Sequence, residues 1–151
     1  MSENTVSIKR QNTQESLKTA QQMYASFGRG DLQAVLNILA DDIEWEVRGP
    51  THIVPWTGKR RGRDQVAEYF KLIGETVVIN KFEQQDIIAQ DEKVMAIFHE
   101  QARNKKTGRT YETAIVHSIV VRRQKVAKFD GYMETGRVHL SFVRLILRID
   151  H

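Results

Sequence analysis

Cysteine is absent from the 151 residues of this chain. Disulfide bonds, thiolate metal sites and cysteine nucleophiles are therefore excluded. The absence is compatible with a reducing compartment, and together with the lack of an export signal it leads us to expect a cytoplasmic protein.

Long apolar runs are also missing. No stretch approaches the length that a membrane span needs. The first residues, MSENTVSIKRQNTQ, are polar and contain no apolar segment typical of a secretory signal. We therefore expect no membrane span.

A strong excess of one charge is lacking too, since 23 Lys and Arg face 19 Asp and Glu, for a net charge of +4. The basic clusters at residues 59–63, 105–106 and 122–125 fall in predicted loops and turns, where solvated charge is normal. A nucleic-acid surface would need basic residues on one face with interleaved aromatics. That pattern is not visible, so nucleic acid is not expected as a partner.

Motifs that bind metals or cofactors are missing as well. The histidines show no HxH or HxxxH spacing of the kind that binds zinc. They are His52, His99, His117, His139 and His151. No Gly-rich phosphate loop follows a predicted strand, and no serine occupies a nucleophile elbow. We expect neither a metal nor a cofactor.

Helical periodicity occupies the first half of the chain. Residues 1–12 read as a frayed tail, and a helix is expected after them, with Asn12 and Glu15 resembling a capping box. Asp31 is expected to cap a second helix, and Arg63 to open a third. Between the second and third helices, residues 49–62 hold both prolines and three glycines, which predicts a long irregular loop that is often functional.

Period-two alternation predicts a short strand before that loop and four longer strands after the third helix. They cover residues 43–47, 77–89, 94–103, 111–122 and 126–135. The short turns between the last four predict antiparallel hairpins. The fold class is therefore α+β, with helices covering one face of a curled sheet and leaving a cavity at its open end.

The last segment, residues 137–151, carries apolar residues on one helical face and arginines on the other. This pattern predicts an amphipathic helix, and an extra edge strand is the alternative. The helix could dock on its own domain or on a second subunit, with a membrane-surface role as a third choice.

Several short motifs follow one another in an order that resembles a known family. A glycine-aspartate helix connection, the sequence DDIEW, a Gly/Pro loop, the sequence GKRRGR and a final YME resemble the SnoaL-like proteins. These belong to the nuclear transport factor 2-like and ketosteroid isomerase-like superfamily. The resemblance implies that residues 13–136 form a cone, in which a curved mixed β-sheet wraps around the three helices. It also implies an apolar pocket and, usually, a homodimer.

The resemblance carries over three positions: Trp45, His117 and Glu134, the last of which is usually aspartate in the family. By the period-two rule Glu134 shares a strand face with Tyr132 and Asp130. We expect this face to line the pocket, where loss of hydration would make Glu134 a base near neutral pH. Its plain alternative is a strand-end carboxylate in water or paired with a nearby arginine. His117 could bind a ligand carbonyl or orient Glu134, and a satisfied buried histidine is its alternative.

Six further residues are candidate ligand contacts. They are Trp45, Trp56, Tyr24, His52, Phe70 and His99. The tryptophans are more often packing residues than ligand platforms. Since His99 and Glu100 are adjacent on a strand, only one of them can face the pocket, and the pattern does not decide which.

These observations lead us to expect a pocket protein for a small, mostly apolar molecule. If it is an enzyme, the resemblance implies proton transfer next to a carbonyl without a cofactor, as in isomerases, cyclases and dehydratases. Glu134 would move the proton, and His117 or Tyr132 would hydrogen bond to the enolate oxygen. The alternative is a non-catalytic ligand-binding or dimerisation module.

Overall fold

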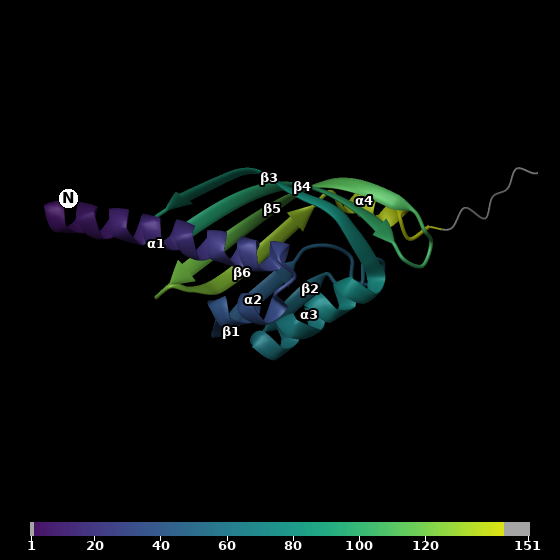
Figure 1. The fold of residues 1–151 in the computed structure, drawn as a ribbon, viewed down its shortest axis with the longest axis horizontal. Helices are drawn as coiled ribbons and strands as arrows, with labels where there is room; N and C mark the ends of the chain where they lie inside the picture. The colour runs from purple at the N-terminus through teal and green to yellow at the C-terminus, as the bar shows by residue number, and fades with distance from the viewer. Residues whose placement is uncertain (1, 144–151) are drawn as a thin grey trace, which may run out of the picture.

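The first helix, α1, spans Glu3–Gly28 in the computed structural model, which describes residues 2–143. Its N-cap is Ser2, whose side chain accepts a hydrogen bond from the backbone of Thr5 at 3.2 Å. The frayed tail predicted over residues 1–12 is therefore wrong from Glu3 onward. The first turns of α1 project beyond the sheet (Figure 1). Asn12, the expected cap, instead donates to Asp91 in the turn after the third strand, at 2.9 Å.

A tight turn after α1 leads into α2, Leu32–Ile38. Asp31 caps this helix as predicted, because its carboxylate accepts from the backbone of Ala34 at 3.1 Å. The first strand, β1, follows without a loop and covers Leu39–Val47, four residues more than predicted.

The glycine- and proline-rich segment holds a short strand that the sequence did not predict, β2, Gly58–Arg61. It pairs antiparallel with β1. Helix α3 begins at Arg63 as predicted and runs to Thr76. The residue before it, Gly62, has φ 85°, a conformation that favours glycine.

Four long strands complete the sheet. They are β3 (Val77–Gln90), β4 (Lys93–Asn104), β5 (Thr110–Arg122) and β6 (Lys125–Met133). The strand order is β2-β1-β6-β5-β4-β3. Only the β1–β6 pair among the described strands is parallel, so the sheet is mixed. It is curved and not closed, and the three N-terminal helices lie on one face of it (Figure 1). The predicted α+β cone is confirmed.

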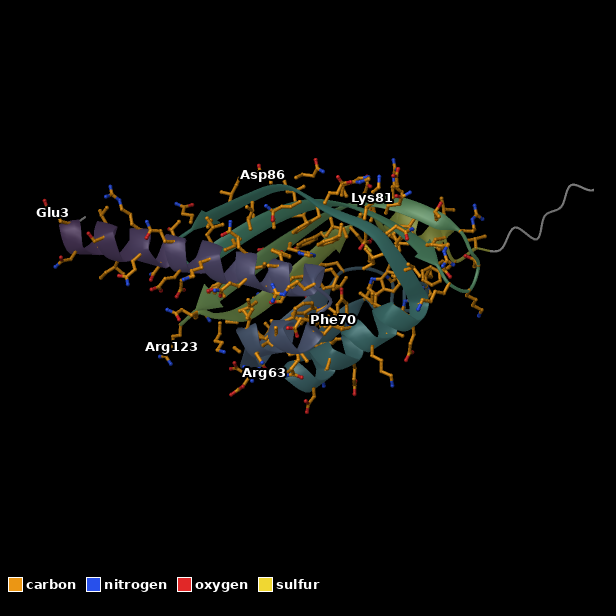
Figure 2. All side chains as sticks on the ribbon, in the orientation of Figure 1. Glu3, Arg63, Phe70, Lys81, Asp86 and Arg123 are labelled. Atoms are coloured by element: carbon orange, nitrogen blue, oxygen red, sulfur yellow. The ribbon has the colours of Figure 1, made fainter. Side chains whose placement is uncertain are left out.

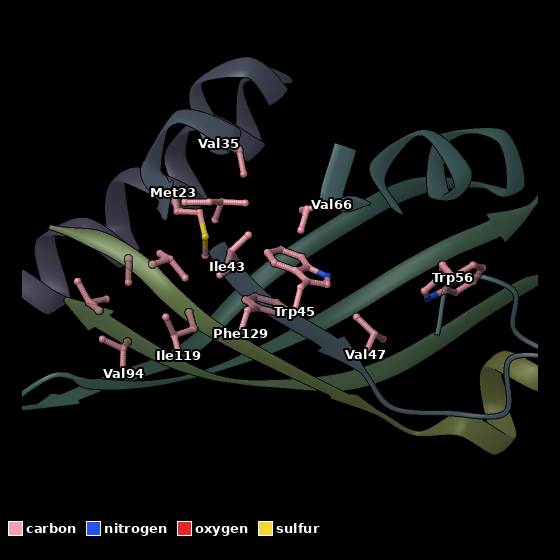
Figure 3. Packing of buried hydrophobic residues seen from close by; sticks show 14 of the residues in the cluster. Met23, Val35, Ile43, Trp45, Val47, Trp56, Val66, Val94, Ile119 and Phe129 are labelled. Carbon is pink, nitrogen blue, oxygen red and sulfur yellow. The ribbon is translucent and has the colours of Figure 1, made fainter. Parts of the chain in front are cut away.

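Side chains fill the space between those helices and the concave face of the sheet (Figure 2). At the centre of this core Trp45 stacks on Phe129, with ring centroids 3.8 Å apart and planes 8° from parallel (Figure 3). Phe70 of α3 meets the same indole edge-on at 5.7 Å. Offset and edge-on aromatic pairs each add about 1 kcal/mol beyond area burial, so this cluster anchors α3 to β1 and β6.

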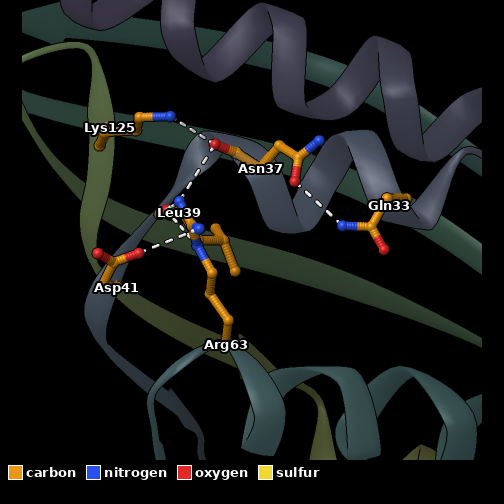
Figure 4. A network of polar contacts seen from close by, with 6 residues as sticks. All are labelled: Gln33, Asn37, Leu39, Asp41, Arg63 and Lys125. Carbon is orange, nitrogen blue, oxygen red and sulfur yellow. Dashed lines mark hydrogen bonds and ion pairs between the residues drawn. The ribbon is translucent and has the colours of Figure 1, made fainter.

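A polar network at the base of the cone, where α2 ends and β1 begins, joins these elements to α3 and β6 (Figure 4). The guanidinium of Arg63 donates to the backbone carbonyl of Leu39 at 2.6 and 2.9 Å and pairs with Asp41 at 3.0 Å. Lys125 of β6 donates to the carbonyl of Asn37 at 2.6 Å. Carbonyls at the end of a helix lack intrahelical partners, so these cations satisfy the end of α2 and join it to α3 and β6.

The last described helix is α4, Thr135–Leu140. Val138 is fully buried, and Phe142 packs against Trp56 at 5.9 Å. The Thr107 hydroxyl donates to the carbonyl of Ser141 at 2.6 Å. The described part of the predicted C-terminal helix is therefore short and packs on its own sheet, while residues 144–151 lie outside the described chain.

Candidate functional site

The concave face of the sheet, α1 and α3 enclose a cavity of about 540 Å³, its open mouth included. Its wall is mostly aromatic and aliphatic. The polar side chains in that wall are Tyr24, Tyr69, Glu100 and His117. An apolar cavity with a few convergent polar groups is the usual form of a small-molecule site.

A second cavity of about 420 Å³, the open space at its mouth included, adjoins the first. The two share six wall residues: Tyr69, Ile73, Ile79, Glu100, Ile115 and His117. The second cavity continues past Trp56 and Tyr111 toward Tyr132, which is 43% exposed.

Glu100 is the one acidic side chain that lines either cavity within the described chain. It is 8% exposed. Burial raises its pKa from 4.5 to about 7, and a hydrogen bond from the Tyr111 hydroxyl to Oε2, at 3.4 Å, partly opposes that rise. A carboxyl that loses hydration and gains no cation favours its neutral form. Glu100 is therefore divided between acid and base near neutral pH.

Two tyrosines flank this carboxyl. Burial raises the pKa of both Tyr69 and Tyr111, and the nearby Glu100 raises it further. Both hydroxyls therefore keep their protons and can donate. Tyr111 donates to Glu100. The Arg60 guanidinium lies 5.0 Å from the centre of the Tyr69 ring, a cation–π distance that holds this ring in place.

His117 lies further along the cavity floor, and its Nδ1 is 2.7 Å from the hydroxyl of Tyr24 on α1. Burial lowers the pKa of His117 from 6.5 to about 3, so the imidazole is neutral at physiological pH. The ring keeps some accessible surface because it faces the cavity. The aromatic rings of Phe98 and Phe129, with centroids 5.3 and 4.5 Å away, surround it.

Register fixes the spacing of these groups. Glu100 of β4 lies opposite Thr113 of β5, and His117 follows Thr113 by four residues on the same face of the strand. At about 3.3 Å per residue the two positions are roughly 13 Å apart along the strand. Ile115 lies between them, so an apolar floor separates the carboxyl from the imidazole.

Six of the predicted site residues line the cavities. Tyr24, Trp45, Phe70 and His117 line the first, and Trp56 and Tyr132 line the second. Trp45 is both a core residue, 3% exposed, and part of the wall. Its indole N–H has no hydrogen-bond partner within the described residues.

The position predicted for Glu134 is wrong. Its side chain is 48% exposed, accepts a hydrogen bond from the backbone of Ala114 at 2.9 Å and lies 3.5 Å from Arg137. It lines neither cavity. Asp130 and Tyr132 point the same way, to the outer face, where Arg48 pairs with Asp130 at 3.0 Å and lies 5.3 Å from the Tyr132 ring centre. Tyr132, although 43% exposed, also lines the second cavity.

Two predicted histidine contacts are also outside the cavity. His99 lies on the outer face of β4, because its neighbours Phe98 and Glu100 point inward. His52 is exposed in the loop between β1 and β2. The open choice between His99 and Glu100 is therefore resolved in favour of Glu100.

Glu100, Tyr69 and Tyr111 were not predicted as site residues. Tyr111 lines the second cavity together with His117. Glu100 continues the alternation of Val94, Ala96 and Phe98, all of which are buried, but Met95 and Ile97 make the opposite face equally apolar, so the pattern alone does not place Glu100 inward. No group of three metal-binding side chains is found within residues 2–143. No helix among those residues is long and apolar enough to cross a membrane.

Comparisons with known proteins agree with this architecture. Residues 20–129 match the SnoaL-like domain. A nuclear transport factor 2-like protein from Burkholderia xenovorans LB400 is 31% identical, with a TM-score of 0.78, covering 87% of this chain and 98% of that one. No curated protein matches the chain.

Two further structures share the fold at lower identity. A candidate polyketide cyclase from Xanthomonas campestris pv. campestris is 21% identical, with a TM-score of 0.71, covering 87% of this chain and 99% of that one. A candidate isomerase from Bacillus subtilis is 15% identical, with a TM-score of 0.74, covering 87% and 94%.

Proposed function

The chain belongs to the SnoaL-like domain family, and we propose that its cavity binds a small, mostly apolar molecule and moves a proton on it without a cofactor. The observation that carries this proposal is Glu100, a carboxyl with a pKa of about 7 in an apolar cavity. A general base works best when its pKa lies near the operating pH. The candidate cyclase and isomerase among the similar structures support the same reaction class.

The proton would leave a carbon next to a carbonyl. Ionised Glu100 would take it, and the electron pair of the C–H bond would pass into the carbonyl to give an enolate. The Tyr69 hydroxyl, which has no hydrogen-bond partner among the described residues, would donate to the enolate oxygen. In a β,γ-unsaturated ketone the enolate is conjugated with the C=C bond, so protonated Glu100 would return the proton at the γ-carbon, which moves the double bond next to the carbonyl and completes an isomerisation. Tyr111 would position Glu100 through its 3.4 Å hydrogen bond.

The proposal is tested with 2-tetralone, an enolisable and mostly apolar ketone. Hydrogen–deuterium exchange at its α-carbons in D₂O, followed by proton NMR, should be accelerated by the protein. Because Glu100 acts as a base, the rate should rise with pH and reach half its maximum near pH 7. Glu100→Gln should lower the rate by about 10² to 10⁴.

The matched control is Glu112→Gln, which removes an exposed carboxyl from the same sheet. This variant should exchange the ketone at the wild-type rate. If Glu100→Gln keeps the wild-type rate on a probe that demonstrably binds, the proton-transfer proposal is wrong.

Binding without chemistry is the second candidate function. The specific observation in its favour is that a single acidic side chain lines the cavities within the described chain. A binding module predicts that 2-tetralone binds with no accelerated exchange, and that Glu100→Gln changes affinity only modestly. Calorimetry and the exchange rate together separate the two functions.

We also propose that the protein is a homodimer that pairs through the outer face of the sheet. Ile88, Met95 and Ile97 are 59%, 38% and 40% exposed. Ile88 lies opposite Met95, and Ile97 opposite Val116, so these residues are neighbours on one face. Exposed apolar patches of this kind mark interaction sites, and a stable interface should bury more than about 1,000 Å² in total.

A further inference from the structure

The strand β6 has a glycine in its interior, at the inner face beside His117. Gly131 is the register partner of His117 on β5, and its carbonyl accepts from the backbone of Arg48 on the other side. Glycine inside a strand weakens it and often marks a place where a ligand approaches the backbone closely. The stability of the strand therefore does not explain why residue 131 is a glycine.

A side chain at this position would meet the walls of both cavities. A Cβ built on Gly131 would lie 3.4 Å from Phe129, which lines the first cavity, and 3.5 Å from Val47, which lines the second. It would lie 3.6 Å from Cδ2 of His117, which lines both. Gly131 itself lines the second cavity, and a side chain there would contact residues in the walls of both cavities.

The chemistry of the two cavities differs. The first is bounded by the rings of Trp45, Phe70 and Phe129 and suits a planar apolar group. The second holds the hydroxyl of Tyr111 and leads toward the half-exposed Tyr132. Glu100 and His117 belong to both.

We propose that the two cavities form one elongated binding site, and that Gly131 determines which molecules fit it. The ligand is a planar apolar molecule longer than two fused rings. Its apolar part lies against Trp45, its middle passes over Gly131, and its oxygen-bearing end reaches the Tyr111 cavity. This inference rests on the proposed site but not on catalysis, since it concerns binding alone.

The test compares a short probe and a long one. We use 2-naphthol, which occupies a single cavity, and 6-phenyl-2-naphthol, which needs both. Gly131→Val should weaken binding of the long probe by about tenfold or more and change binding of 2-naphthol by less than about twofold, as measured by calorimetry. In the wild-type protein the long probe should show NMR contacts to the indoles of both Trp45 and Trp56.

Two further variants keep the test decisive. Gly131→Ala adds one methyl group at ordinary van der Waals distances, so it should fold even if the valine variant does not, and it should weaken the long probe selectively. Gly136→Ala is the matched control, because nothing lies within 4 Å of a Cβ there. It should leave both affinities unchanged.

The proposal is overturned if Gly131→Ala and Gly131→Val weaken both probes equally, or if the long probe contacts only one of the two tryptophans. Either result leaves the 2-tetralone exchange experiment unaffected. Conversely, loss of exchange chemistry with selective binding intact would overturn the enzymatic proposal and keep the elongated site.

Discussion

The hydroxyl of Tyr24 lies 2.7 Å from Nδ1 of His117, so one hydrogen bond joins the first helix to the fifth strand. A phenol is a better donor than a neutral imidazole N–H, and an imidazole nitrogen is the better acceptor. Tyr24 therefore donates, and the His117 proton resides on Nε2. The ring is held as a neutral donor at the junction of the two cavities.

This relationship predicts the effect of Tyr24→Phe. The variant should lose about 1 kcal/mol of stability, and its His117 should populate both neutral tautomers. Nitrogen-15 NMR of the imidazole measures the change directly. A wild-type ring already protonated on Nδ1 would contradict the assignment.

A second prediction concerns the pH dependence of stability. The folded state releases the Glu100 proton near pH 7, whereas the unfolded chain releases it near 4.5. Between these values the folded state binds more protons, so this group lowers stability as pH rises. Its cost is absent below pH 4.5 and reaches about 3 kcal/mol above pH 7.

Glu100→Gln should therefore be more stable than the wild type at pH 8, by up to about 3 kcal/mol, and should match it at pH 4. Urea denaturation at both pH values measures the difference. A constant difference between the two proteins across this range would contradict a raised pKa.

A third prediction compares Glu134, the base expected from the sequence, with Glu100, the base proposed from the structure. Glu134 is half-exposed and lines neither cavity. Glu134→Gln should therefore keep the wild-type rate of 2-tetralone exchange, where Glu100→Gln loses it. The opposite ranking would restore Glu134 as the base.

A fourth prediction tests the network at the base of the cone. Arg63→Met removes hydrogen bonds to the Leu39 carbonyl and the ion pair with Asp41. The buried Leu39 carbonyl at the end of α2 then loses these donors, which should lower the free energy of unfolding by about 2 kcal/mol. Lys71→Met is the control, since Lys71 is 79% exposed and only weakly paired with Glu75; its effect should stay below about 0.5 kcal/mol.

A fifth prediction concerns self-association. Ile97→Glu places a charge in the outer apolar patch and should convert the proposed dimer to a monomer in sedimentation experiments at high micromolar concentration. Ile8→Glu is the control: Ile8, in α1, is 57% exposed against 40% for Ile97, and its replacement should leave the oligomeric state unchanged. A wild-type monomer at that concentration would sink the dimer proposal.

The register of β6 explains why the predicted site face was wrong. Val126 is buried. If the strand alternated strictly from Val126 onward, the side chains of Asp130, Tyr132 and Glu134 would also point inward. The pairing skips Ala127, since Val121 lies opposite Val126 and Val120 opposite Lys128. This extra residue reverses the alternation, so Phe129, Gly131 and Met133 face the cavity instead.

The phase of β4 was undecided for a different reason. Val94, Ala96 and Phe98 alternate with Met95 and Ile97, so both faces read as apolar. Only the packed fold reveals which set is buried and which forms the outer patch. The order of the helices and the long strands, by contrast, follows from local periodicity and caps such as Asp31, and it was predicted correctly.

The two edges of the sheet bear on how this protein avoids unwanted assembly. The outer strand β3 carries two bulges, after Ile79 and after Gln84, and the charges Lys81 and Asp86 project from it (Figure 2). The opposite edge, β2, is four residues long and ends in consecutive arginines. Irregular, charged or very short edges resist the addition of further strands. Fibrous growth and strand exchange between copies are thereby disfavoured, although the strands are long and the outer face of the sheet carries an apolar patch.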